Sequence, residues 1–292
     1  MTGSAADADD VVQETFVHAL SHPPRTDLPL LPWLVKVSLN AARDVLRRRR
    51  RRGYVGPWLP DPIELEPDPE AAPAADVRYD RLESASFAFL LALEALTVRQ
   101  RAVLLLRDVF DYSVRETAEA LSINEGAVKT LHHRARSALL DYDRQRAPAA
   151  DRANLARQAL ARLMMAVTAG DVAGVEALLT ADAQLLNDAG GEFVAALRPI
   201  RGKPKVARGM VALARKSPRA AAEVRWVNGF PSLVVTDPAP APRHAGSFVL
   251  GIDVDASGSI RAVYAVLARA KLRRVRFSVS YTHLTLPTIL RV

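Results

Sequence analysis

The feature that most limits the fold of this chain is a cluster of six prolines between residues 53 and 80. Proline lacks an amide hydrogen and its ring fixes φ, so this stretch cannot form a regular helix or a central strand. We therefore expect residues 53–80 to be an extended linker between separately folded parts. Trp58 and Leu59 are too apolar for a free tether, and we expect them to dock on a folded surface. The prolines are Pro57, Pro60, Pro62, Pro67, Pro69 and Pro73.

Before the linker, residues 1–52 have the spacing of two amphipathic helices. Ser4 can cap a first helix running from Ala5 to Leu20, and Pro32 suits the first turn of a second helix. The second helix runs into six consecutive arginines at 47–52, which either contact phosphate or are simply solvated. The apolar residues of the first helix are Val11, Val12, Thr15, Phe16 and Ala19. Its other face carries Asp7, Asp9, Asp10, Gln13 and Glu14.

Those acidic residues have two interpretations. They can form a surface for a partner, or they can simply favour the start of a helix through its dipole.

After the linker, residues 81–146 are again expected to be helical, and their helix starts can be placed. Two capping boxes satisfy the first amides of a helix through reciprocal side-chain bonds. Asn124 is a third N-cap candidate, in front of a helix that begins at Glu125. The capping boxes are Thr97 with Gln100 and Ser113 with Glu116.

Residues 113–138 carry the strongest local pattern, that of a helix-turn-helix. Two helices that cross at a sharp angle need a small residue at the crossing and an apolar residue on the second helix, and Ala118 and Val128 meet this need. Ser122 departs from the pattern, because such turns commonly place glycine there. The outer face would enter the major groove of DNA, or it is the solvated basic face of an ordinary helical hairpin. The candidates for DNA contact are Asn124, Glu125, Lys129, Thr130, His133, Arg134 and Arg136.

From residue 154 to about 272, helices are followed by strand-like runs, which predicts an α+β domain. An enzyme of this kind would need a pocket carboxylate or histidine as acid and base. Asp188, Asp253, Asp255 and His244 are available, but each also fits an ordinary turn, loop or strand end, and we expect no catalytic residue. The expected helices are 153–169, 172–179 and 206–215, and the expected strands are 222–227, 232–236, 247–253 and 260–267.

Composition removes several classes of function. The chain has no cysteine, which excludes disulfides, thiolate metal sites and cysteine nucleophiles, and we expect neither a metal nor a cofactor. Its 40 Lys+Arg exceed its 32 Asp+Glu, and this net charge of +8 favours a polyanionic partner. No apolar run approaches the roughly 20 residues that span a bilayer, so we expect a cytoplasmic protein with no membrane partner.

Three segments resemble conserved regions of the extracytoplasmic-function (ECF) sigma factors of the sigma-70 family. DADDVVQETF at 7–16 resembles the helix of their second region that binds core RNA polymerase. PWLVKVSLNAARDVLRRRR at 32–50 resembles the adjoining helix that melts the downstream promoter element, and residues 96–136 resemble the fourth region, which reads the upstream element as a duplex. The resemblance implies polymerase contacts by Asp7, Asp9, Asp10, Gln13 and Glu14, and contacts to single-stranded promoter DNA by Asn40, Asp44, Arg47 and Arg48.

The linker segment YVGPWLPDP at 54–62 resembles a motif of one subgroup of this family. Members of the subgroup carry a cone-shaped, SnoaL-like (NTF2-like) α+β domain at the C-terminus, which is thought to touch the linker and tune activity. Residues 154–272 are expected to be that domain, and NDAGGEF at 187–193 is an altered form of its Asp-Gly-rich loop. The linker residues implied in regulation are Pro57, Trp58, Leu59, Pro60 and Pro62.

Both ends of the chain depart from the family pattern. A further helix normally precedes the position of Met1, so we expect the second region, residues 1–52, to be truncated. Residues 278–292 differ in style from the Ala/Arg-rich sequence before them and resemble translated adapter sequence. We expect this tail to be artefactual or disordered.

Together these patterns predict a multidomain protein with two all-α domains, the second a helix-turn-helix, and a C-terminal α+β domain. The predicted function is that of a sigma factor, which directs core RNA polymerase to specific promoters without catalysing a covalent step. Its activity would be modulated by the C-terminal domain, through an unidentified small molecule or an intramolecular contact. Two alternatives stay open: a helix-turn-helix regulator that acts without polymerase, and a SnoaL-like isomerase or cyclase fused to a DNA-binding module.

Overall fold

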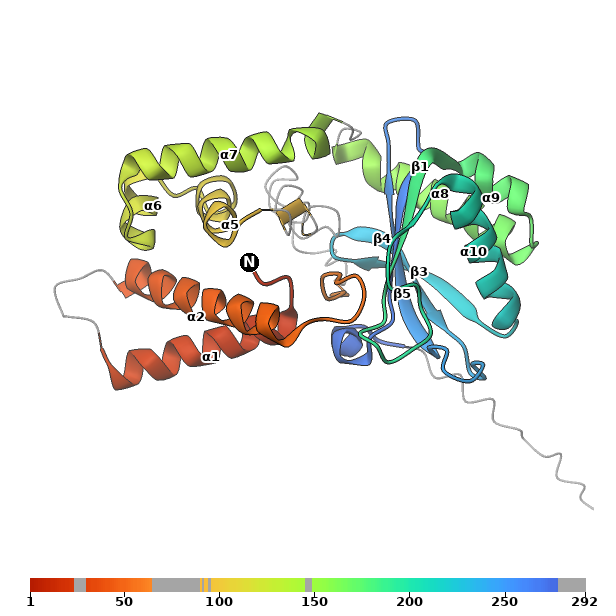
Figure 1. Cartoon of the computed structure of the whole chain (residues 1–292), viewed down its shortest axis with the longest axis horizontal. Helices are drawn as coiled ribbons and strands as arrows, with labels where there is room; N and C mark the ends of the chain where they lie inside the picture. Colours follow the sequence, from red (N-terminus) through yellow and green to blue (C-terminus); the bar gives the residue numbers. More distant parts are fainter. Residues whose placement is uncertain (24–29, 65–89, 91, 94–95, 145–148, 278–292) are drawn as a thin grey trace, which may run out of the picture.

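The structure is a computed structural model that describes residues 1–23, 30–64, 90, 92–93, 96–144 and 149–277, with the backbone alone at 50, 52, 140–144 and 149–150. The rest of the linker and the tail at 278–292 lie outside the described residues. Figure 1 shows a half made of helices and a half built on a sheet, with the described part of the linker between them.

The N-terminal half begins with a hairpin of two helices, α1 (Ala5–Ser21) and α2 (Leu30–Arg52). Ser4 caps α1 as expected, because its hydroxyl accepts a hydrogen bond from the backbone amide of Asp7 at 3.3 Å. The expectation for the inner face of α1 is wrong in part: Val12 and Phe16 are 52% and 57% exposed. The reason is that α2 packs along α1 over one stripe, which is enough to bury Val11 but not its neighbours.

The second helical domain contains α5 (Val98–Leu104), a short π-helical turn η1 (Leu105–Val109), α6 (Val114–Leu121) and α7 (Glu125–Arg144). Both expected capping boxes are confirmed, at the starts of α5 and α6. The turn between α6 and α7 passes through Ser122, which adopts a left-handed conformation with φ of 53°. This explains why glycine is common at this position, and here serine takes its place. Val103, Ala118 and Val128 form the core of the motif.

The C-terminal half opens with α8 (Ala149–Thr168) and α9 (Val172–Leu178). Strands β1 (Leu179–Asp188) and β2 (Ile200–Arg201), helix α10 (Lys203–Lys216), strands β3 (Ala221–Val227), β4 (Phe230–Thr236), β5 (Ser247–Val254) and β6 (Ile260–Val266), and a 3₁₀ helix η2 (Arg269–Arg274) follow. The strand order is β2-β1-β6-β5-β4-β3, and β1 pairs with β6 in parallel whereas the other neighbours are antiparallel. The α+β expectation is confirmed.

The two faces of this sheet are covered differently. Helices α8, α9 and α10 pack on one face and fill it with a large apolar core that includes Leu160, Val206 and Val263. The other face is covered by η2 and by the linker, whose Leu59 is fully buried there. Figure 1 shows the three helices and η2 on opposite sides of the sheet.

Strand β1 was not expected from the sequence. It follows α9 without a break, and its sequence LTADAQLLND has few of the β-branched and aromatic residues that favour strands. Its pairing partner β6 lies far along the chain, with Leu185 opposite Val263. The long-range pairing therefore overrides the local preference.

The burial of Leu160 predicts a test of this core. Leu160→Ala should lower the stability of the C-terminal domain by about 2–5 kcal/mol, because it removes a side chain with 0% exposure from between α8 and the sheet. Hydrogen exchange of the β6 amides measures this change. Met165→Ala is the control on the same helix, at a residue 66% exposed, and it should change stability by no more than about 0.5 kcal/mol.

Candidate functional site

The outer face of α7 is exposed, as a DNA-reading helix requires. Val128 and Ala135 are fully buried on its inner side, so its opposite side faces solvent. Asn124 acts as the N-cap, since its side-chain oxygen accepts the amide of Ala127 at 2.7 Å. The candidates that lie exposed on α7 are Glu125, Lys129, Thr130, His133, Arg134 and Arg136.

Among the exposed candidates on α7, Arg136 forms an ion pair with an acidic side chain of the same domain. Its Nε lies 2.9 Å from Asp108, a residue of η1, and the same carboxylate is 2.7 Å from His132. A guanidinium has five donor hydrogens, so this pair orients Arg136 while leaving donors for a phosphate.

The candidates on α2 lie along one exposed stripe. Successive candidates are three or four residues apart, apart from two neighbouring arginines, and this spacing places them on the same side of the helix. They are Asn40, Asp44, Arg47 and Arg48. Asn40 accepts a hydrogen bond from Arg43 at 3.3 Å, and Asp44 pairs with Arg47 at 3.1 Å. Exposed pairs of this kind contribute little, so a nucleic acid can displace them at low cost.

The acidic candidates on α1 are divided among three environments. Asp7 is half-buried and pairs with Arg49 of α2 at 2.5 Å. Asp9 pairs with Arg274 of η2, also at 2.5 Å, so the C-terminal domain touches this helix. The remaining candidates, Asp10, Gln13 and Glu14, are exposed.

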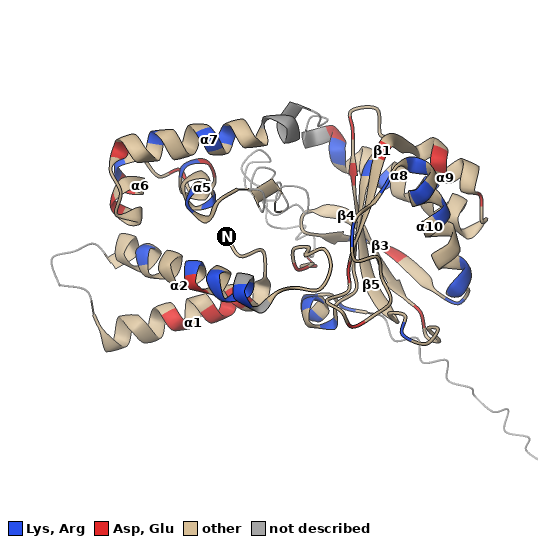
Figure 2. Cartoon of the chain, viewed as in Figure 1, with Lys and Arg blue, Asp and Glu red and all other residues tan. Residues whose placement is uncertain are grey.

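Apolar side chains lie exposed beside these acidic ones. A mixed surface of this kind, apolar and acidic, suits a protein partner better than it suits DNA. Figure 2 shows Asp and Glu on α1, and Lys and Arg on α7 and on the C-terminal part of α2. The exposed apolar residues are Val12, Phe16, Val17 and Leu20.

One buried carboxylate, that of Asp188 at the end of β1, gathers several of the contacts between the linker and the C-terminal domain. Asp188 has 0% exposure and accepts three hydrogen bonds. The Tyr54 hydroxyl donates at 2.5 Å, the Leu59 amide at 2.7 Å and the Lys271 ammonium at 2.7 Å. Lys271 also donates to the Leu59 carbonyl. We call Tyr54, Leu59, Asp188 and Lys271 the linker clamp.

Burial shifts the pKa values of the clamp. The pKa of Lys271 lies below its usual value because burial disfavours the ammonium, and the charge of Asp188 opposes this shift only in part. Burial raises the pKa of Tyr54, and its hydrogen bond to Asp188 raises it further, so the phenol keeps its proton. Burial also raises the pKa of Asp61, next to the clamp, while Lys271 and the hydrogen bond from Ser4 act against it.

Trp58 joins the clamp to the helical half. Its ring has the Arg49 guanidinium 4.3 Å from the ring centroid and the Lys271 ammonium 4.0 Å from it, which are cation–π distances. Gly3 packs on the same ring, where an added Cβ would lie 2.6 Å from a ring carbon, so only glycine fits there. The carboxylate of Asp61 accepts the Ser4 hydroxyl and the amide that begins α1, each at 2.9 Å.

The end of the described linker extends the sheet. Glu64 forms a β-bridge with Val227 at the end of β3. Ile63 and Asn228 exchange two hydrogen bonds, at 2.8 and 2.9 Å, and Asn228 also donates to the carbonyl of Asp61. Residues 59–64 are therefore packed as part of the C-terminal domain.

Docking of Trp58 and Leu59 was expected, but the residues that receive them were not found from the sequence. Asp188 was interpreted as a turn or strand-end residue, and Lys271 was not singled out. The altered loop at 187–193 does contact the linker, since Gly190 packs against Tyr54 and Gly191 against Val55. The one available signal was the position of Asp188 in that loop. Pro57 is half-buried, whereas Pro60 and Pro62 are buried.

Comparison with known families places the two helical domains. The family model for Sigma-70 region 2 matches residues 1–52, and that for Sigma-70, region 4 matches residues 86–139. These segments hold the α1–α2 hairpin and the helix-turn-helix, so fold and sites together define a transcription initiation factor of the sigma-70 type.

Individual relatives narrow this class. The ECF RNA polymerase sigma factor SigJ of Mycobacterium tuberculosis (strain ATCC 25618 / H37Rv) is 34% identical over 218 residues, which cover 74% of this chain and 68% of SigJ. SigG of Mycobacterium tuberculosis (strain CDC 1551 / Oshkosh) is 36% identical over 209 residues, 63% of this chain and 55% of SigG. The crystal structure of Mycobacterium tuberculosis SigJ matches with a TM-score of 0.71 and 28% identity, covering 92% of this chain and 91% of that one. The chain belongs to the ECF sigma factor family.

The clamp geometry predicts the effect of removing its charge. Asp188→Asn keeps the shape of the side chain but removes the carboxylate that is hydrogen-bonded to the buried Lys271 ammonium, which costs about 3–5 kcal/mol. The linker should therefore open more often, and exchange of the Leu59 amide should become about a hundredfold faster or more. Asp182→Asn, at an exposed position of the same strand, is the control and should leave this amide protected. Unchanged exchange in Asp188→Asn would show that the clamp does not hold the linker.

Proposed function

We propose that this chain is a promoter-specific sigma factor, which binds core RNA polymerase through α1 and contacts promoter DNA through α2 and α7. The observation that carries the proposal is that acidic and basic surfaces lie on different helices of the same chain. The exposed acidic and apolar face of α1 suits a protein partner, whereas Lys129, His133 and Arg134 on α7 suit a major groove. A free-standing regulator would not need the first of these surfaces.

The stripe on α2 fits the second DNA contact. Its exposed arginines can neutralise phosphates, and its amide and carboxylate can hydrogen-bond to an unstacked base. The helix-turn-helix would meanwhile hold the duplex upstream. One chain would thus grip two successive stretches of a promoter.

We propose that the C-terminal domain regulates rather than catalyses. The three aspartates considered as acid or base all have structural partners: Asp188 in the clamp, Asp253 near Arg261 at 3.7 Å, and Asp255 in a turn where it accepts bonds from Ser257 and Ser259. The space between the helices and the sheet is filled by apolar side chains.

Within the described residues no group of His, Asp and Glu could hold a metal ion, and no helix there is long and apolar enough to cross a membrane.

Regulation would act through the clamp. The domain holds the linker between the two helical regions, and its Arg274 pairs with Asp9 of the proposed polymerase-binding helix. The clamp fixes the path of the linker, and the exposed Asp9–Arg274 pair adds a weaker contact to α1. A change in the domain would therefore alter how polymerase and promoter are engaged.

Promoter binding tests the role of α7. Arg134→Ala should weaken binding to a promoter duplex by about 1–3 kcal/mol, because it removes an exposed cation from the groove-facing side. Fluorescence anisotropy at fixed salt measures this affinity. Lys216→Ala, at an exposed position on α10, is the control of equal charge change and should bind like the unmodified chain.

Polymerase binding tests the role of α1. The double change Asp10→Asn and Glu14→Gln removes two exposed carboxylates without changing their size, and we expect affinity for core polymerase to fall about tenfold or more. Pull-down with core enzyme and run-off transcription provide the measurements. The pair Asp151→Asn and Asp182→Asn removes the same charge from the C-terminal domain and should have no effect on polymerase affinity. Equal affinity of all three proteins would contradict the assignment of α1.

A further inference from the structure

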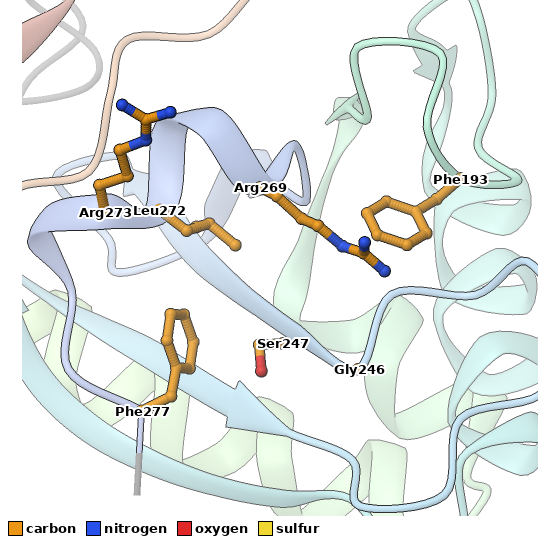
Figure 3. A pocket seen from close by; sticks show the side chains of 7 residues that line it. All are labelled: Phe193, Gly246, Ser247, Arg269, Leu272, Arg273 and Phe277. Carbon is orange, nitrogen blue, oxygen red and sulfur yellow. The ribbon is translucent and has the colours of Figure 1, made fainter. Parts of the chain in front are cut away.

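A cleft of about 360 Å³ lies next to the clamp, on the face of the sheet opposite the helices. Its size falls within the range of small-molecule sites. Figure 3 shows that its walls come from η2, from the loop that carries Phe193 and from the start of β5. The lining residues are Phe193, Gly246, Ser247, Arg269, Leu272, Arg273 and Phe277.

The cleft combines a cation and a hydroxyl with apolar walls, which suits an anion that also has an apolar body. Arg269 lies over the ring of Phe193, with its guanidinium carbon 5.2 Å from the ring centroid, and it has no acidic partner among the described residues. The hydroxyl of Ser247 has no hydrogen-bond partner there either. Leu272 and Phe277 supply apolar walls (Figure 3). The nearby carboxylate of Glu192 accepts the backbone amide of Arg269 and does not line the cleft.

The two main walls of the cleft are the two segments that hold the linker. Helix η2 carries Arg269 and Leu272 into the cleft, and between them Lys271 points to the clamp. The loop that ends in Phe193 begins at Asp188, the acceptor of the clamp. A molecule bound between these segments would therefore favour the arrangement in which both are in place around the linker.

We propose that this cleft binds a small anion with an aromatic body, and that binding tightens the linker clamp. The anionic group lies between Arg269 and the Ser247 hydroxyl, and the aromatic body packs against Phe193, Leu272 and Phe277. The site lies wholly within the C-terminal domain and does not rest on the proposed sigma-factor function.

The test uses two fluorescent probes that share a ring system. 1-Anilinonaphthalene-8-sulfonate carries an anionic group, whereas N-phenyl-1-naphthylamine does not. With the full chain we expect the sulfonate to bind at one saturable site at least tenfold more tightly than the neutral probe. Arg269→Ala should weaken sulfonate binding by roughly tenfold or more, since a charge-assisted hydrogen bond is lost, and Ser247→Ala should weaken it by a few fold.

Arg219→Ala is the control, because it removes an exposed arginine outside the cleft. Saturating sulfonate should also slow exchange of the Leu59 amide at least threefold in the unmodified chain and not in Arg269→Ala. Equal binding of the two probes, equal binding by Arg269→Ala and Arg219→Ala, or unchanged exchange at Leu59 would each overturn the proposal. Since neither DNA nor polymerase is present, these outcomes leave the proposed sigma-factor function untouched.

Discussion

A buried carboxylate paired with a buried ammonium is the interaction on which the arrangement of this protein depends. Removing both charges from water costs several kcal/mol per ion, and their attraction offsets that cost only when the remaining lone pairs find donors. Here the donors come from the linker, through a tyrosine hydroxyl and the Leu59 amide. The pair of Asp188 and Lys271 is thus completed by a segment more than a hundred residues upstream, and Asp188 loses two of its three donors when the linker leaves.

The same few residues transmit this constraint to the helical half. Trp58 lies between a cation from each half, Arg49 and Lys271, so its ring is a shared contact surface. Asp61 then accepts the first amide of α1 and the hydroxyl of Ser4. Each contact alone is modest, of the order of 1 kcal/mol. Because they share one short stretch of chain, a change in the position of the linker would alter all of them at once.

Local patterns in the sequence predicted much of the helical half and less of the sheet. Capping boxes and the small residue at the helix crossing act within a few residues, so the sequence alone predicts the helix-turn-helix. β1 could not, because its partner β6 is remote and its own residues do not favour a strand. The receiving side of the linker was missed for the same reason: Asp188 and Lys271 are 83 residues apart in the sequence, and only the fold brings them together. Linker docking itself could be predicted, since exposed tryptophan and leucine carry a cost wherever they lie.

The bridge between Glu64 and β3, and the burial of Leu59 beneath η2, have a consequence for what counts as a module in this chain. A boundary placed at the start of α8 follows the covalent order but cuts through a hydrophobic core. A fragment beginning there would keep η2 but lose Leu59, and the apolar side chains that Leu59 covers would face water. The folded unit is instead discontinuous: it consists of the end of the linker and the C-terminal domain. A transfer of this domain to another protein would therefore have to include that part of the linker to keep the core closed.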